Sequence, residues 1–137
     1  MNWHKEFFDN TWLIWAVLVM CLVVLFCGIA NAEDLKASWY SEASLIKEGT
    51  RASGEPQIMA NGKVFNENAL TCACRLYPLG TMLKITNIEN GKSVIVKVTD
   101  RIGKRFAKSR IDLSKKAFQN IASLKKGLIK ISVEEVN

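Results

Sequence analysis

The chain has 137 residues and a net charge of +6, and 49% of its residues are hydrophobic. Its single histidine, His4, lies near the N-terminus. The rest of the chain therefore cannot build a Ser-His-Asp triad, a Cys-His pair or a His-ligated zinc site, and its chemistry must come from carboxylates, hydroxyls or thiols.

The first element in chain order is a leader, residues 1–32. Residues 12–30 carry no charge and are followed by Asn31-Ala32, which completes a small-x-small pattern typical of a secretory signal peptide cleaved after Ala32. At ~1.5 Å per residue, a helix of this length could also span a bilayer, and Lys5 is the one firm positive charge before it. We expect a signal peptide, with an uncleaved membrane anchor as the alternative.

Residues 33–137 predict one exported domain with its own core. The leader holds one of the 19 basic residues and two of the 13 acidic ones, so this domain has a net charge of +7. That charge serves solubility, or indicates an anionic polymer or a membrane surface as partner. Export argues against a nucleic-acid partner.

Short segments of alternating polarity follow the leader and predict β-strands. We expect strands over 35–41, 81–88, 93–99 and 128–136, with a surface loop over 48–57 and a turn within 58–65. Asn90-Gly91 is a hairpin signal, so the second and third of these strands should pair antiparallel.

The hydrophobic period becomes helical over residues 112–124. Ser114, or Asp112 before it, is a suitable N-cap, and Gly127 follows the helix. Mostly short strands with one short helix predict a small, mainly β barrel.

Two carboxylates stand at the ends of these elements. Asp100 ends a strand, and Asp112 comes twelve residues later at the expected helix entry. Paired carboxylates are the usual equipment for cleaving glycosidic bonds, with one kept protonated as the acid. Alternatively, Asp112 caps the helix or accepts loop hydrogen bonds, and Asp100 pairs with Arg101 or Arg110.

The adjacent aromatics Trp39 and Tyr40 end the first strand. Alternation directs one toward the core and leaves the other free to stack on a sugar ring. Cys72 and Cys74 share one face if they lie on a strand. They could be buried thiols or a strained disulfide, whereas a metal site would need further ligands.

Five segments taken together resemble the rare lipoprotein A family. In family order they are ASWYS (37–41), MANGKVFN (59–66), LTCACRLYPLGT (70–81), ITNIENGKSVIVKVTDR (85–101) and RIDLSKKAF (110–118). The resemblance implies a six-stranded double-psi β barrel with one or two short helices. It also implies a bacterial periplasmic or cell-envelope location, with peptidoglycan glycan strands as the partner.

Enzymes of this family are lytic transglycosylases, which cleave between N-acetylmuramic acid and N-acetylglucosamine and leave 1,6-anhydro ends. The resemblance implies that Asp100 is the general acid and that Asp112 stabilises positive charge or tunes that acid. A further five residues in the matching segments are candidates for glycan binding: Trp39, Tyr40, Asn61, Thr71 and Arg101. We expect no cofactor and no metal. We also expect a monomer, which would contact the membrane only if the leader is not cleaved.

The sequence departs from the family at one candidate catalytic position. Family enzymes end the LTAAH-like segment in a histidine thought to matter for catalysis, and Cys74 occupies that place here. A thiol cannot do the acid or base work of imidazole at the same pKa. Two functions therefore stay open: a lytic transglycosylase, or a non-catalytic, expansin-like barrel that binds cell-wall glycan.

Overall fold

The computed structural model describes residues 11–27, 34–49 and 54–137. The chain divides into two compact units, residues 1–32 and 33–137. In the first unit, Thr11–Cys27 form helix α2. The expected cleavage site after Ala32 lies outside the described residues, so the signal peptide and its alternative stay predictions. Across the described ranges, no helix combines the length and apolarity needed to cross a membrane.

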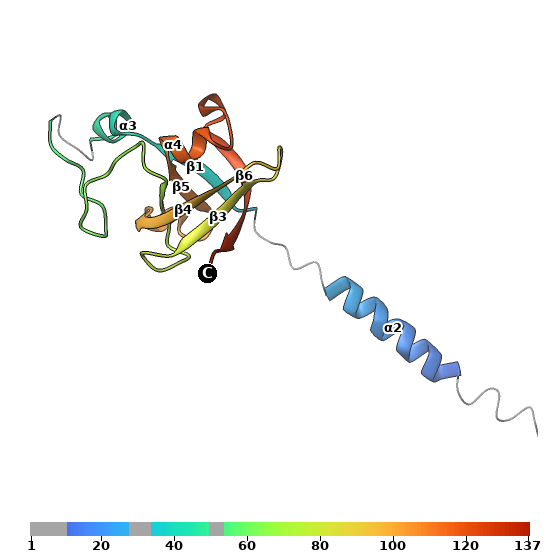
Figure 1. Ribbon diagram of the computed structural model, residues 1–137. Coiled ribbons are helices and arrows are strands. Elements are labelled where there is room, and N and C mark those ends of the chain that lie inside the picture. Colours follow the sequence, from blue (N-terminus) through green and yellow to red (C-terminus); the bar gives the residue numbers. More distant parts are fainter. Residues whose placement is uncertain (1–10, 28–33, 50–53) are drawn as a thin grey trace, which may run out of the picture. The chain divides into compact units, whose positions relative to one another are not determined.

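Six strands of the second unit close into a barrel in the order β1-β5-β2-β4-β3-β6 (Figure 1). β1 runs parallel to β5 and β2 parallel to β4, whereas the other neighbours are antiparallel. The expected six-stranded barrel is therefore confirmed. Its strands are β1 (Lys36–Tyr40), β2 (Thr71–Ala73), β3 (Met82–Asn87), β4 (Ser93–Asp100), β5 (Arg110–Ser114) and β6 (Leu128–Glu135).

The hairpin predicted from Asn90-Gly91 is the pairing of β3 with β4. Gly91 takes a φ of 73°, the left-handed conformation that such a turn requires. Along β4, Val94, Val96 and Val98 are buried as the alternation predicts, and they join the barrel core.

The expected helix over 112–124 is wrong at both ends, because the helix extends only over Lys115–Gln119. β5 continues to Ser114, and the helix α4 (Lys115–Gln119) begins one residue later. Ser114 is its N-cap, because its Oγ accepts a hydrogen bond from the backbone N–H of Ala117 at 3.3 Å. Asp112 is therefore a strand residue and not a cap, because Ile111 and Leu113 on either side of it are buried in the core.

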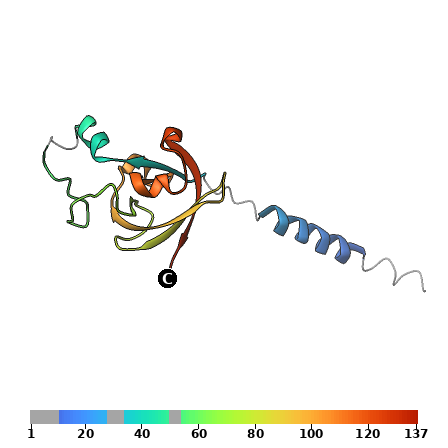
Figure 2. The same cartoon turned by 45° about the horizontal axis from the view of Figure 1, so that its top comes forward.

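A second short helix, α3 (Glu42–Lys47), follows β1 directly at one end of the barrel (Figure 2). Its N-cap is Ser41, whose side chain and that of Ser44 form a reciprocal capping box. The described part of the unit also contains the 3-10 turns η1 (Lys104–Phe106) and η2 (Leu124–Lys126). The segment between β4 and β5 that contains η1 borders the candidate site described next.

Candidate active site

A cavity of about 370 Å³ opens at the end of the barrel where β1 and β4 finish. Its walls come from β1, from α3 and Glu48 after it, from the segment that follows β4, and from β5. Among its lining residues are three acids and two arginines: Glu48, Asp100, Asp112, Arg101 and Arg110.

The strand pairing brings the two aspartates into this cavity. Ala73 of β2 lies opposite Asp100 on β4 and opposite Asp112 on β5. The pairing of β2 with β4 shifts register between Cys72 and Ala73, which is where Asp100 meets β2. Two carboxylates twelve residues apart thus flank one small residue, and Ala73 also lines the cavity between them.

Asp112 is a half-buried residue in the interior of β5. Its neighbour Ser38, the residue opposite it on β1, donates its hydroxyl proton to Oδ1 of Asp112. Burial raises the pKa of Asp112 above its ordinary value, the Ser38 hydrogen bond and Arg110 act in the opposite direction, and Glu48 raises it further. Asp112 therefore has an environment that favours its protonated form.

Asp100 has different hydrogen-bond partners. Its Oδ1 accepts the backbone N–H groups of Ala60 at 3.0 Å and of Arg101 at 2.8 Å. The cavity therefore holds one carboxylate whose pKa is raised by burial and one whose oxygen is held by two backbone N–H groups.

Of the two adjacent aromatics, Trp39 packs against the core, and its indole N–H donates to the Leu124 carbonyl at 3.2 Å. Tyr40 stacks on Phe65, with ring centroids 4.4 Å apart. Burial raises the pKa of Tyr40, as do the nearby acidic groups Asp100, Cys72 and Asp112, whereas its interaction with Thr71 lowers the pKa; the hydroxyl stays protonated. Both aromatics line the cavity as well.

Arg101 also lines the cavity, but its guanidinium is held by the chain after β2. Its Nη1 donates to the carbonyls of Cys74 and of Tyr77, each at 2.6 Å. Arg101 therefore fixes the position of the 74–77 segment and does not form the ion pair with Asp100 that the sequence left open.

Cys74 does not line the cavity, although its backbone N–H donates to the Asp100 carbonyl at 3.0 Å. Its side chain is completely buried in the core, where Sγ accepts the backbone N–H of Leu76 at 3.3 Å. Cys72 is equally buried, and both are free thiols. Burial, followed by the neighbouring Cys74 and Asp112, raises the pKa of Cys72, so this thiol is not an activated nucleophile.

Two further expected residues do not line the cavity. Asn61 lies in an exposed turn, where its Oδ1 accepts the backbone N–H of Lys63. Thr71 lies on β2, and its buried hydroxyl interacts with Tyr40, which lines the cavity. Residues missed by sequence reasoning include Ser38, Glu48 and Arg110. Ser38 and Arg110 lie in two of the five segments that resemble the family, 37–41 and 110–118. Knowing that these segments pair as β1 and β5 would have identified both residues.

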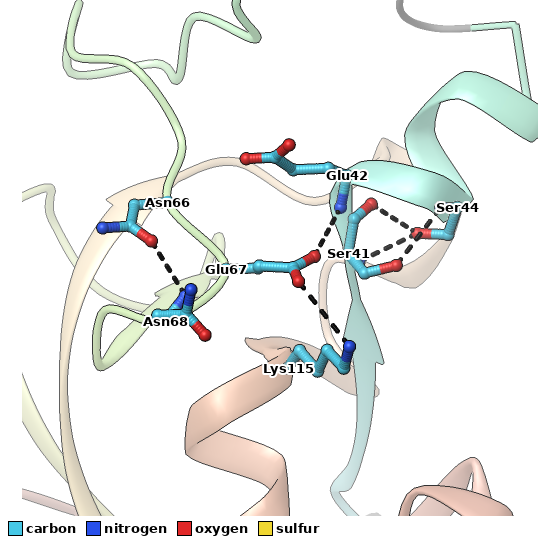
Figure 3. Close-up of polar contacts among 7 residues, drawn as sticks. All are labelled: Ser41, Glu42, Ser44, Asn66, Glu67, Asn68 and Lys115. Atoms are coloured by element: carbon cyan, nitrogen blue, oxygen red, sulfur yellow. Dashed lines mark hydrogen bonds and ion pairs between the residues drawn. The ribbon is translucent and has the colours of Figure 1, made fainter.

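The wall formed by α3 is attached to the rest of the barrel by Glu67 (Figure 3). The Oε2 of Glu67 accepts the backbone N–H of Glu42 at 3.0 Å, and its Oε1 lies 3.6 Å from Nζ of Lys115. The Glu67 carbonyl accepts the N–H of Lys116 at 3.0 Å. One side chain therefore connects α3 to the start of α4.

In the described parts of the chain, no group of three or more His, Cys, Asp or Glu residues could hold a metal ion.

Comparison with known proteins gives consistent results. Residues 32–133 match the protein family described as "Lytic transglycolase". A "Probable endolytic peptidoglycan transglycosylase RlpA" from Treponema pallidum is 37% identical over 122 residues, which cover 89% of this chain and 35% of that protein. The chain thus spans about a third of the length of this curated relative.

Two solved structures share the fold. A Streptomyces papain inhibitor superposes with a TM-score of 0.56 at 19% identity, over 74% of this chain and 91% of that one. A point mutant of an expansin from Clavibacter michiganensis, in complex with cellohexaose, superposes with a TM-score of 0.54 at 21% identity, over 75% of this chain and 49% of that one. At these identities the likeness concerns the fold alone.

Proposed function

Because the chain belongs to the lytic transglycolase family, we propose that its barrel cleaves peptidoglycan glycan strands as a lytic transglycosylase. The observation that carries the proposal is the cavity in which Asp100 and Asp112 meet in different environments. The relatives that share this barrel bear the name of peptidoglycan transglycosylases. The substrate is the bond between N-acetylmuramic acid and N-acetylglucosamine.

In the proposed reaction the carboxyl group of Asp112 gives its proton to the glycosidic oxygen, and the bond from that oxygen to the anomeric carbon breaks. The 6-hydroxyl oxygen of the muramoyl sugar bonds to the same carbon. Its proton goes to the Asp112 carboxylate, which restores the acid for the next cycle. The products are a free hydroxyl on one sugar and a 1,6-anhydro ring on the other, and no water is consumed.

The environments of the two aspartates support an exchange of the roles expected from the family resemblance. A general acid near neutral pH needs a raised pKa, and burial supplies this at Asp112. Asp100, whose Oδ1 is fixed by two backbone donors, lines the same cavity, where it can face the positive charge that develops on the sugar ring. Asp112 is therefore the proposed acid and Asp100 the proposed electrostatic stabiliser.

The rest of the cavity supports the binding of a sugar. Tyr40 and Trp39 offer aromatic surface on its wall, and Ser38 holds the proposed acid. Arg101 is proposed as a positioning residue because its donors are already engaged with carbonyls. A glycan partner is consistent with an exported protein of the cell envelope, and the finer location and the monomeric state remain proposals.

The test is cleavage of purified sacculi by the full chain and by Asp112→Asn. The Asn side chain keeps an oxygen to accept the Ser38 hydrogen bond but has no proton to donate to the leaving group. We expect release of soluble muropeptides to fall at least 100-fold, a typical contribution of general acid catalysis. Unchanged release by a folded Asp112→Asn variant would refute the assignment of the acid.

Cys74 favours a second candidate function, a barrel that binds glycan without cutting it. The residue at the family's histidine position gives the cavity no imidazole, and its thiol lies in the core. This second function predicts that the protein pellets with sacculi yet releases no fragment. The first function predicts both pelleting and release, so the same incubation separates the two.

A further inference from the structure

We propose that the segment between β4 and β5 forms a basic rim that binds the carboxylates of the glycan substrate beside the cleavage cavity. This inference rests on the proposed function and extends it to a second subsite. The basic rim consists of Lys104, Arg105, Lys108 and Arg110.

The rim forms part of the wall of two cavities. Arg110, with Gly103, lines the cavity that holds the aspartates. Lys104, Arg105 and Lys108 line another cavity of about 470 Å³. Residues 101–110 contain five basic residues and no acid. One short segment therefore extends positive charge from the cleavage cavity into an adjacent one.

The arginines of the rim are held in place by an aromatic ring. The guanidinium carbon of Arg110 lies 4.2 Å from the centroid of the Phe106 ring, and that of Arg105 lies 5.4 Å from it. Such cation–π contacts leave the planar donors of arginine available for a carboxylate. The turn itself is closed by a hydrogen bond from the Ala107 N–H to the Lys104 carbonyl at 3.2 Å. An ordered cationic segment loses less entropy when it binds an anion.

The charges around the rim favour an anionic substrate at this place. The cleavage cavity is lined by Glu48, Asp100 and Asp112, so it disfavours carboxylates of the substrate. The acid that lines the second cavity, Asp34, lies 3.1 Å from Nζ of Lys130, which offsets its charge. A glycan strand with a carboxylate on every muramoyl unit would therefore place its sugar among the aspartates and its acid on the rim.

Peptidoglycan carries such carboxylates in two forms. Strands freed of peptide expose the lactyl carboxylate of each muramoyl sugar, and intact strands carry the carboxylates of the stem peptide. The rim would bind a carboxylate of either kind. Glycan substrates that carry only one of the two kinds distinguish the lactyl carboxylate from those of the stem peptide.

The experiment measures pelleting of the full chain, kept in a non-ionic detergent, with insoluble glycan at low salt. Every protein carries Asp112→Asn, so that binding is measured independently of cleavage. The test variant adds Lys104→Gln, Arg105→Gln and Lys108→Gln. A matched control instead adds Lys84→Gln, Lys92→Gln and Lys97→Gln, which remove the same charge from exposed residues of the β3–β4 hairpin. The glycan is peptide-bearing, amidase-stripped, or converted to neutral amides with carbodiimide and methylamine.

We expect the rim variant to bind roughly three- to thirtyfold more weakly than the control on at least one glycan that keeps its carboxylates. The difference should vanish on the amide-capped glycan. Loss on stripped strands assigns the lactyl group, and loss on peptide-bearing strands alone assigns the stem peptide. Equal binding by the two variants would overturn the rim while leaving the cleavage proposal intact. A rim-dependent loss of binding to mixed micelles of phosphatidylglycerol, with glycan binding unchanged, would also overturn it in favour of a lipid surface.

Discussion

At the scale of single residues, the account depends on the different surroundings of two aspartates. The half-buried Asp112 accepts a hydrogen bond from Ser38, whereas Asp100 accepts two backbone N–H groups. The sequence alone identified both residues but not their roles, because a role depends on which strand lies opposite each carboxylate. Ser38 lies 74 positions from Asp112 along the chain, and only the parallel pairing of β1 with β5 brings them together.

The raised pKa of Asp112 predicts a pH dependence of stability. Its folded pKa lies above its unfolded value because of burial, so the folded state binds a proton that the unfolded state has released. Its contribution to stability is complete below the unfolded pKa and is lost as the pH rises through the folded one. Asp112→Asn should therefore be more stable relative to the natural chain at pH 7 than at pH 3. Urea unfolding at both values measures this, and an equal difference at the two pH values would contradict it.

Cys74 stands where family enzymes have a histidine. Because its side chain is buried, the substitution Cys74→His tests the packing of the core as well as catalysis. Cys74→His would put a larger polar ring into a fully buried site. Overpacking and an unpaired polar group should together lower the free energy of unfolding by about 2–4 kcal/mol, without a gain in cleavage. Chemical unfolding and muropeptide release measure the two effects. A folded Cys74→His variant that cleaves faster than the natural chain would show that this position does reach the cavity.

At the scale of elements, α3, which forms one wall of the cavity, could not be predicted from the sequence. The segment 41–48 had no helical period long enough to predict a helix, because α3 has only six residues and no buried one. It is held by its capping box and by Glu67, contacts between side chains and backbone that leave no hydrophobic pattern. Four of the strands, β1, β3, β4 and β6, were predictable to within one or two residues at each end, because alternation records which side faces the core. β2 and β5 were not predicted as strands, since three and five residues are too few to establish an alternating pattern.

This attachment of α3 yields a prediction for Glu67. Glu67→Ala removes both the hydrogen bond to Glu42 and the contact with Lys115, so the wall that carries Ser44, Leu45 and Glu48 loses a support. We expect weaker glycan pelleting with a change in stability of about 1 kcal/mol or less, as is usual for exposed pairs. The matched control is Glu89→Ala, which breaks the exposed pair with Lys126 and should leave pelleting unchanged. Equal effects of the two variants would contradict a special role for Glu67.

At the scale of the whole molecule, the barrel explains how the candidate site can form in so short a domain. Closing six strands places the ends of β1, β4 and the interior of β5 around one cavity, although these residues are far apart in the sequence. The barrel and its family were accessible from the sequence, because five short segments occur in order. The basic rim could not be predicted, since the sequence does not show which cavities its four side chains line.

The central claim is that this barrel cleaves glycan by intramolecular closure with Asp112 as the acid. Mass spectrometry of the ends released from purified sacculi tests it most directly. The account predicts muropeptides with 1,6-anhydro ends from the natural chain, and their loss in Asp112→Asn. Reducing ends in place of anhydro ends, or no soluble product from a folded protein that pellets with the same sacculi, would contradict it.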